Sequence, residues 1–213
     1  GKINEYDFVI LGAGVTGLAA AMYAARLGLK TLVLGATHGS ELPIGGVITT
    51  TNVVENYPGF IRLTGSELAD KIKEHALSYD LVEIKEERAE SIEKKQNGFY
   101  IKTKKGDYSG KSILFATGTK WRKLEVPGAK ELENKGVAFC ALCDSVLFKN
   151  KTVAVIGGSD SAAKDALVLA EHAKKVFIIY RGEEIHPEPI NMERIKANKK
   201  IEMINKTNVI EVK

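Results

Sequence analysis

The sequence predicts an α/β fold with two doubly wound units, each around a parallel sheet, and an antiparallel meander inserted in the first. An apolar run, a glycine-rich turn and a helical pattern begin near residue 7 and recur near residue 153. Each copy leads to a second apolar strand, which makes it a βαβ unit with a right-handed crossover. Short alternating strands separated by turn residues lie between the copies and predict the meander.

The first unit starts with a strand that runs from Asp7 to a glycine turn. Apolar residues then recur at helical spacing from Leu18 to Leu29, and residues 31–34 form a second aliphatic strand. The segment Thr64-Gly-Ser-Glu67 is a capping box and predicts a helix that continues to about Tyr79. The first unit is therefore expected to bury its sheet beneath at least two helices.

The meander is expected from two turn signals. Asn97-Gly98 lies between alternating runs and predicts a hairpin with a type I′ turn, and residues 105–107 suggest a second turn. A buried strand then covers 112–116 and is followed by residues 121–128, which read as a linker between domains. We place the boundary between the domains near residue 120.

The second unit is less complete than the first. Its helix is followed by a strand over 176–180, after which Pro187 and Pro189 interrupt the chain. Residues 192–198 predict a short helix, and 201–212 predict two short strands. Because the unit begins at 151 and only 63 residues remain, we expect the chain to be part of a longer polypeptide.

The composition is that of an ordinary globular protein. The 213 residues are 44% hydrophobic and 27% charged, with a formal net charge of +4. So mild a charge gives no reason to expect a nucleic acid as partner. No basic and apolar leader opens the chain and no stretch approaches the roughly 18 apolar residues of a membrane span, so we expect a cytoplasmic protein away from membranes.

The glycine turn of the first unit has the spacing of a pyrophosphate-binding loop. In Gly12-Ala-Gly-Val-Thr-Gly17 the first glycine permits a tight turn, the second lets the backbone approach phosphate, and the third lets helix and strand pack. A glycine turn without a ligand is the alternative. The acid that would bind the adenosine ribose is absent, because the second strand ends in Gly35. Because the strand, glycine turn and helix recur in the second unit, both units are expected to be Rossmann-like domains.

The second turn differs at the position of the close-approach glycine. In Gly157-Gly-Ser-Asp-Ser-Ala162, Ser159 replaces that glycine, and its Cβ narrows the space for pyrophosphate. Arg181 follows the next strand, where it suits a 2′-phosphate. A fold whose nucleotide site has decayed is the alternative.

Cys140 and Cys143 form the only cysteine pair in the sequence. A zinc site would need further ligands, and the histidines at 38, 75, 172 and 186 are scattered, so we assign neither a metal nor a role to them. Two inert thiols are possible. A vicinal pair followed by Asp144 fits dithiol exchange better, because one thiolate attacks, the other resolves, and the carboxyl group handles the proton.

These motifs resemble the low-molecular-weight thioredoxin reductases of the pyridine nucleotide-disulphide oxidoreductase superfamily. The resemblance runs over nearly the whole chain through residues 12–17, 45–51, 54–59, 116–118, 140–144 and 157–162. It implies FAD bound by residues 1–119, a domain that resembles NAD(P)-binding domains over 120–213, and a homodimer that passes electrons to a thioredoxin-like protein disulphide. Cys143 would face the flavin, Cys140 would attack the partner, and Asp144 would be the general acid.

The resemblance also assigns contacts to the two cofactors. For FAD the expected residues are Gly12, Ala13, Gly14, Val15, Thr16, Gly17, Gly46, Val47, Asn56, Ala116, Thr117 and Gly118. For NADPH or NADH they are Gly157, Gly158, Ser159, Asp160, Ser161 and Arg181.

Three positions depart from the family pattern. Val47 stands where members have a glutamine. Members bind the 2′-phosphate with two adjacent arginines and a third after a short spacer, and here only Arg181 remains, with His186 near the third position. A Gly-Asp segment that completes the flavin domain in members does not occur in this sequence. We expect poor affinity for both nicotinamide nucleotides with little preference between them. The electrons that pass through FAD to Cys140 and Cys143 are therefore expected from a reduced nicotinamide or from another donor. A flavin-binding redox or regulatory module that has lost nucleotide turnover is the alternative function.

Overall fold

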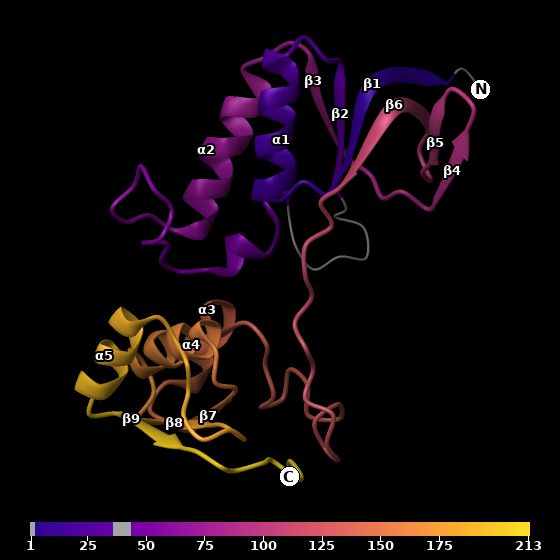
Figure 1. Cartoon of the computed structure of the whole chain (residues 1–213). Coiled ribbons are helices and arrows are strands. Elements are labelled where there is room, and N and C mark those ends of the chain that lie inside the picture. The colour runs from indigo at the N-terminus through magenta and orange to yellow at the C-terminus, as the bar shows by residue number, and fades with distance from the viewer. Residues whose placement is uncertain (1–2, 36–43) are drawn as a thin grey trace. The chain divides into compact units, whose positions relative to one another are not determined.

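A computed structural model describes residues 3–35 and 44–213 of the chain. The chain divides into two compact units, Gly1–Lys120 and Trp121–Lys213, which we call unit 1 and unit 2. Both contain strands and helices, and each has a sheet with parallel strands (Figure 1). The predicted α/β class, with a meander in the first unit, is confirmed.

Unit 1 is organised by a six-stranded sheet with the order β3-β2-β1-β6-β5-β4. Strands β1, β2, β3 and β6 are parallel, and β4, β5 and β6 form the antiparallel meander. Strand β6 belongs to both parts, because it pairs with β1 along its length and with β5 through Asp107–Gly110. The strands are β1 (Asn4–Leu11), β2 (Thr31–Gly35), β3 (Val82–Glu86), β4 (Ser91–Lys95), β5 (Gly98–Lys102) and β6 (Asp107–Phe115).

Two helices cover one face of this sheet (Figure 1). Helix α1 (Val15–Arg26) and helix α2 (Gly65–Leu77) pack against buried strand residues such as Ile10 and Val33. The predicted capping box is confirmed, since the Thr64 hydroxyl accepts a hydrogen bond from the Glu67 N–H at 3.1 Å. The short 3₁₀ helix η1 (Gly46–Thr50) lies between β2 and α2.

The hairpin between β4 and β5 differs from the predicted type I′ turn. Lys95 pairs with Gly98, so the turn residues are Gln96 and Asn97, and neither has a positive φ. Gly98 instead has φ +138°, and a Cβ there would lie 2.5 Å from the Gly110 carbonyl oxygen. The glycine is therefore needed because β6 approaches closely, which a local turn signal does not reveal.

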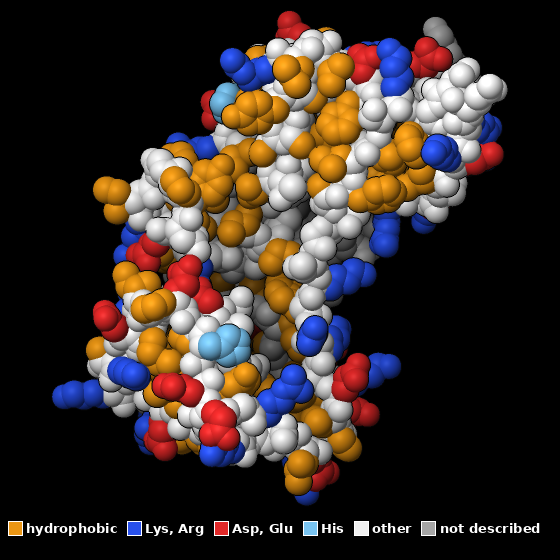
Figure 2. Space-filling model, in the orientation of Figure 1, with side chains coloured by type: hydrophobic (Ala, Val, Ile, Leu, Met, Phe, Trp, Pro, Cys, Tyr) orange, Lys and Arg blue, Asp and Glu red, His pale blue; other side chains and the backbone are white. Residues whose placement is uncertain are grey.

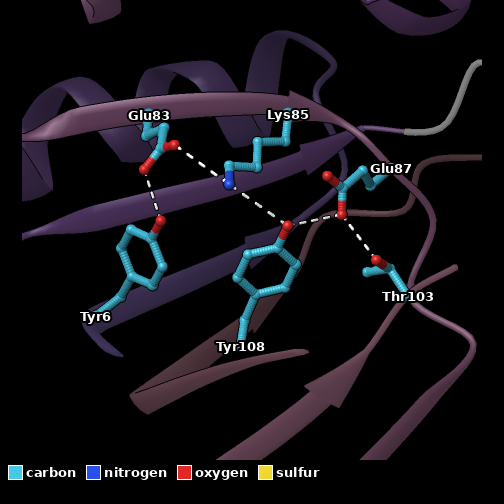
Figure 3. Close-up of polar contacts among 6 residues, drawn as sticks. All are labelled: Tyr6, Glu83, Lys85, Glu87, Thr103 and Tyr108. Carbon is cyan, nitrogen blue, oxygen red and sulfur yellow. Dashed lines mark hydrogen bonds and ion pairs between the residues drawn. The ribbon is translucent and has the colours of Figure 1, made fainter. Parts of the chain in front are cut away.

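A row of polar side chains ties the meander to the parallel strands on the face opposite the helices (Figure 3). The Tyr6 hydroxyl donates to Glu83 at 2.5 Å, and Lys85 lies 3.4 Å from the same carboxylate. Lys85 also donates to the Tyr108 hydroxyl at 3.4 Å, and Tyr108 donates to Glu87 at 2.8 Å. Burial, followed by the hydrogen bond to Glu83, raises the pKa of Tyr6, and the Tyr6 hydroxyl lowers the pKa of Glu83.

Unit 2 contains a three-stranded parallel sheet with the order β7-β8-β9. Helix α4 packs on the sheet through buried alanines, and α5 packs on α4 (Figure 1). The elements are α3 (Ala141–Asp144), the 3₁₀ helix η2 (Ser145–Phe148), β7 (Thr152–Ile156), α4 (Asp160–Ala170), β8 (Lys175–Ile179), α5 (Pro189–Ala197) and β9 (Ile201–Ile204).

The short helix predicted near the end of unit 2 is confirmed as α5, but it starts at Pro189, earlier than predicted, because proline at the first position of a helix needs no N–H partner. The prediction of two short strands over 201–212 is wrong, because these residues contain one strand. After β9 the chain bonds to loops: Thr207 N–H donates to the Tyr180 carbonyl at 3.0 Å and Val212 N–H to Pro127 at 2.9 Å.

Candidate cofactor and dithiol sites

The first glycine turn connects β1 to α1 and is held by neighbouring strands. Gly12 has φ +119°, and its N–H donates to the Leu34 carbonyl of β2 at 2.9 Å. A Cβ at Gly12 would overlap the Ala116 carbonyl, and a Cβ at Gly17 would overlap the Gly12 carbonyl. These two glycines are required by the packing of the protein itself.

Gly14 is different, because the protein does not need it to be glycine. It is the N-cap of α1 with φ −80° and ψ −174°, a conformation that any residue adopts. Among the described residues, the nearest atom to a Cβ at this position would be the Gly45 carbonyl oxygen, at 3.7 Å. Within residues 3–35 and 44–213, the missing side chain therefore leaves space at the start of the helix.

The N-terminus of α1 also has no described side chain that bonds its N–H groups. No side chain that the structure describes caps it, and its first turn carries no acidic residue. The first N–H groups of a helix have no partner within the helix, and they attract anions such as pyrophosphate. Space at Gly14 and donors at Val15 and Thr16 together fit the pyrophosphate of FAD.

Other predicted FAD residues gather around this turn. Gly45 N–H donates to the Ala13 carbonyl at 2.8 Å, which places Gly46 and Val47 at the start of η1 next to Gly14. Ala116 N–H donates to the Leu11 carbonyl at 2.8 Å, so residues 116–118 leave β6 beside Gly12. Asn56 belongs to a separate loop, which the paired residues Val54 and Leu63 close.

The second turn has nearly the same backbone but a filled N-terminus. Gly157 has φ +146° and donates to the Ile179 carbonyl at 3.0 Å, as Gly12 does to Leu34. Ser159 caps α4 with φ −81° and ψ 174°, and its hydroxyl accepts the Ala162 N–H at a long 3.4 Å. One donor of α4 therefore has a partner inside the protein.

A tyrosine ring that the sequence analysis did not single out lies over this turn. A Cβ at Gly158 would lie 2.6 Å from the Tyr180 ring, and one at Gly182 would lie 2.5 Å from it. The corresponding residue in unit 1 is Gly35, because Tyr180 follows Ile179 as Gly35 follows Leu34. Aligning the two repeats by these strand ends would have found the exchange.

The remaining residues of the second turn face helix α5 or solvent. The Asp160 carboxylate accepts the Glu188 N–H and the Asn191 amide, both at 2.9 Å, and so fastens the start of α5 to the start of α4. Ser161 and Arg181 are exposed.

Cys140 and Cys143 are joined by a disulphide at the start of α3. Cys143 is exposed and Cys140 is half-buried. The Cys143 N–H lies 3.2 Å from the Cys140 Sγ and donates to it. This N–H, from the first turn of α3, is therefore directed at the Cys140 sulfur. Asp144 follows directly on the same helical turn.

No other chemistry stands out in the part of the chain that the structure describes. No three His, Cys, Asp or Glu side chains there lie close enough to hold a metal ion, and His38 is outside the described residues. None of the described helices is long and apolar enough to cross a bilayer. Basic and acidic side chains are interspersed over the face drawn in Figure 2.

Comparison with known proteins gives one consistent result. Residues 6–213 match the family described as pyridine nucleotide-disulphide oxidoreductase. The chain is 36% identical over 203 residues to the thioredoxin reductase of Bacillus subtilis (strain 168), covering 95% of this chain and 62% of that relative. The crystal structures of the Lactococcus lactis thioredoxin reductase (FR conformation) and the T. acidophilum thioredoxin reductase are both similar, each with a TM-score of 0.90 and 37% identity.

Those structural matches cover 98% of this chain and 67% and 66% of the two structures, respectively. Measured against the Bacillus subtilis relative, of which 62% is covered, the chain spans less than two thirds of the length.

Proposed function

Because the chain belongs to the pyridine nucleotide-disulphide oxidoreductase family, we propose that it acts as a flavin-dependent disulphide reductase. One observation carries the proposal. The disulphide Cys140–Cys143, whose cysteines are three positions apart, occurs in the same chain as a glycine turn before a helix whose N-terminus no described side chain caps. Vicinal cysteines supply a two-electron couple, and the turn supplies a binding position for the dinucleotide that feeds it. The resemblance to thioredoxin reductases supports a thioredoxin-like protein disulphide as the acceptor.

Unit 1 is proposed to hold FAD at the first turn. Gly14 leaves room for the pyrophosphate, Val15 and Thr16 offer N–H donors, and residues 116–118 border the turn from β6. FAD, when bound, supplies two-electron transfer between a nicotinamide and a disulphide. Val47 does not offer the polar side chain that family members place at that position.

The dithiol is proposed to divide its work between the two sulfurs. Reduction of the disulphide by two electrons and two protons leaves two thiols. Cys140 gives its proton to Asp144, and its sulfur, to which the Cys143 N–H donates, attacks one sulfur of the partner disulphide. The other partner sulfur leaves as a thiolate and takes that proton from Asp144. Cys143 then gives its proton to Asp144 and attacks the Cys140 Sγ, which restores the disulphide and releases the second partner sulfur, and this sulfur takes the second proton.

Unit 2 is proposed to bind NADPH or NADH weakly. The Ser159 side chain occupies space that pyrophosphate needs and bonds one of the α4 donors. This observation also favours the alternative function, a flavin-binding redox or regulatory module without nucleotide turnover. As part of the proposed function, the protein is a homodimer and is located in the cytoplasm.

A reductive titration tests the proposed function. The FAD-loaded chain is titrated anaerobically with dithionite, and wild type should take up about four electrons, two for flavin and two for the disulphide. Cys140→Ser and Cys143→Ser should each take up about two. Ser145→Ala, a buried serine on the next turn, is the matched control and should match wild type.

Turnover then separates the two functions. With added NADPH or NADH and a thioredoxin-like protein disulphide, the wild-type chain should reduce the acceptor and both cysteine variants should not. Acceptor reduction by either variant at the wild-type rate would overturn the dithiol assignment. Flavin that dithionite reduces but neither nucleotide reduces would establish the alternative.

A further inference from the structure

The loops that follow β8 and β9 lie side by side at the carboxyl ends of these strands. Tyr180 N–H donates to the Ile204 carbonyl at 2.9 Å, Thr207 N–H donates to the Tyr180 carbonyl at 3.0 Å, and Lys206 N–H donates to the Gly182 carbonyl at 2.9 Å. These three backbone bonds bracket Arg181 in one loop with Lys206 in the other. The two cationic residues are therefore neighbours although 25 positions separate them in the sequence.

Lys206 is held in an unusual way. Its φ is +53°, in the left-handed region where a lysine is uncommon. Its ammonium group lies 2.7 Å from the Glu183 carboxylate, and both side chains are largely exposed, at 67% and 84%. An exposed ion pair is weak and exchanges readily with other charged groups. Lys206 is therefore positioned next to Arg181 and is available to another anion.

This place in the fold is where the 2′ position of an adenosine ribose is read. In a βαβ nucleotide unit, an acid after the second strand binds the ribose hydroxyls of NAD, whereas arginine accommodates the 2′-phosphate of NADP. Here two cations, Arg181 and Lys206, and two acids, Glu183 and Glu184, occupy the loops at that point. The two cations are neighbours, so they offer a phosphate a pair of charge-assisted hydrogen bonds that a hydroxyl cannot use equally.

We propose that Lys206 is a specificity-determining residue of unit 2 and binds, together with Arg181, the 2′-phosphate of an adenosine nucleotide. The proposal rests on the proposed nucleotide-binding function of this unit. It differs from the expectation drawn from the sequence, in which Arg181 was the one strong partner for the phosphate and the unit had little preference. Ser159 lowers the affinity for both nucleotides, whereas Lys206 sets the ratio between them.

Glu183 takes part in the discrimination through competition. In the free protein its carboxylate is the partner of Lys206. A 2′-phosphate exchanges with this carboxylate and places charge-assisted hydrogen bonds on both cations. A 2′-hydroxyl cannot displace it, so the Glu183–Lys206 pair stays closed when NADH binds.

Two small probes isolate this contact from flavin and nicotinamide. Adenosine 2′,5′-bisphosphate carries the 2′-phosphate, and adenosine 5′-monophosphate lacks it. Their dissociation constants are measured calorimetrically on the FAD-loaded whole chain. We expect Lys206→Met to weaken binding of the bisphosphate about tenfold and to leave the monophosphate unchanged. Glu183→Gln should tighten the bisphosphate, and Lys206→Arg should retain wild-type binding.

Lys175→Met is the matched control. Lys175 also pairs with a glutamate, Glu202 at 2.9 Å, but it begins β8 and so lies at the opposite end of the strand. Its loss removes the same charge and should not change the ratio of the two constants. An unchanged ratio in Lys206→Met, or an equal change in Lys175→Met, would overturn the inference. If wild type binds neither probe, the nucleotide half of the proposed function fails as well.

Discussion

The two glycine turns share a backbone and differ in what fills the space above it. Gly14 and Ser159 have φ −80° and −81° and cap helices that start in the same way, with Leu18 N–H bonded to Gly14 at 2.9 Å and Ala163 N–H to Ser159 at 3.1 Å. In unit 1 the cap residue is glycine and so brings no side chain of its own. In unit 2 a hydroxymethyl group occupies it and bonds the helix.

A second exchange follows the same direction. The residue at the carboxyl end of the second strand is Gly35 in unit 1, whereas the equivalent position in unit 2 holds Tyr180, whose ring covers Gly158. The comparison shows that the two turns keep one backbone geometry while the side chains at equivalent positions differ. Because the proposed difference in nucleotide affinity rests on these side chains, the variants below change them.

The largest expected effect concerns the first glycine of each turn. In Gly12→Ala the new Cβ would overlap the Ala116 carbonyl, and the residue would have to keep φ +119°. We expect the free energy of unfolding to fall by about 4 kcal/mol or more. In Gly157→Ala the Cβ would lie 3.3 Å from the Ala162 side chain, so we expect about 2 kcal/mol, mainly from backbone strain. Denaturant titration measures both, and equal losses would contradict the difference in packing.

The next effect transfers the serine of unit 2 into unit 1. Gly14→Ser keeps an allowed backbone and has room for its Cβ, so stability should remain within about 0.5 kcal/mol of wild type. FAD affinity should fall about a hundredfold, or about 2.8 kcal/mol, because the side chain enters the pyrophosphate space. Fluorescence titration with FAD measures this. An FAD affinity of Gly14→Ser equal to that of wild type would contradict the assignment of FAD to this turn.

A smaller effect distinguishes the two units by how their free energies of unfolding depend on pH. Burial raises the pKa of Asp165, on α4, from 3.8 to about 6. Its folded pKa lies above the unfolded one, so the contribution is fully present below about pH 4 and is lost as pH rises through about 6. Asp165→Asn should therefore raise the free energy of unfolding at pH 7 by about 2 kcal/mol, and hardly change it at pH 4.

Glu83 in unit 1 has the opposite sign. The Tyr6 hydroxyl lowers its pKa below 4.5, so its contribution is present above that value and is lost as pH falls further. Denaturation of Glu83→Gln and Asp165→Asn across pH 3–8 tests both, with the fluorescence of Trp121 as the probe for unit 2. A destabilised Asp165→Asn at pH 7 would contradict the burial argument.

The sequence predicted local features better than contacts between distant segments. The capping box at Thr64 was predicted correctly because its partner, Glu67, lies three residues away. The turn at residues 96–97 was not, because its form depends on how closely Gly98 approaches Gly110. Residues after β9 read as a strand from their alternation, whereas bonds to Tyr180 and Pro127 determine their path.

The candidate sites follow the same division. The glycine spacing predicts the first turn correctly between a strand and a helix, and the same spacing shows Ser159 as a departure, which the structure explains by its cap on α4. Tyr180 and Lys206 were missed, because their positions over the second turn and beside Arg181 result from the pairing of β8 with its neighbours. No pattern within a short window encodes such a placement.

The affinity of Ser159→Gly for NADP⁺ tests the central claim most directly, because this change gives unit 2 the cap residue of unit 1. We expect binding to tighten about tenfold, or about 1.4 kcal/mol, which is less than the loss in Gly14→Ser because in the proposed site Arg181 and Lys206 also contribute to the affinity. FAD affinity, measured on the same protein, should not change. An unchanged NADP⁺ dissociation constant would contradict the claim that this one side chain separates the two turns.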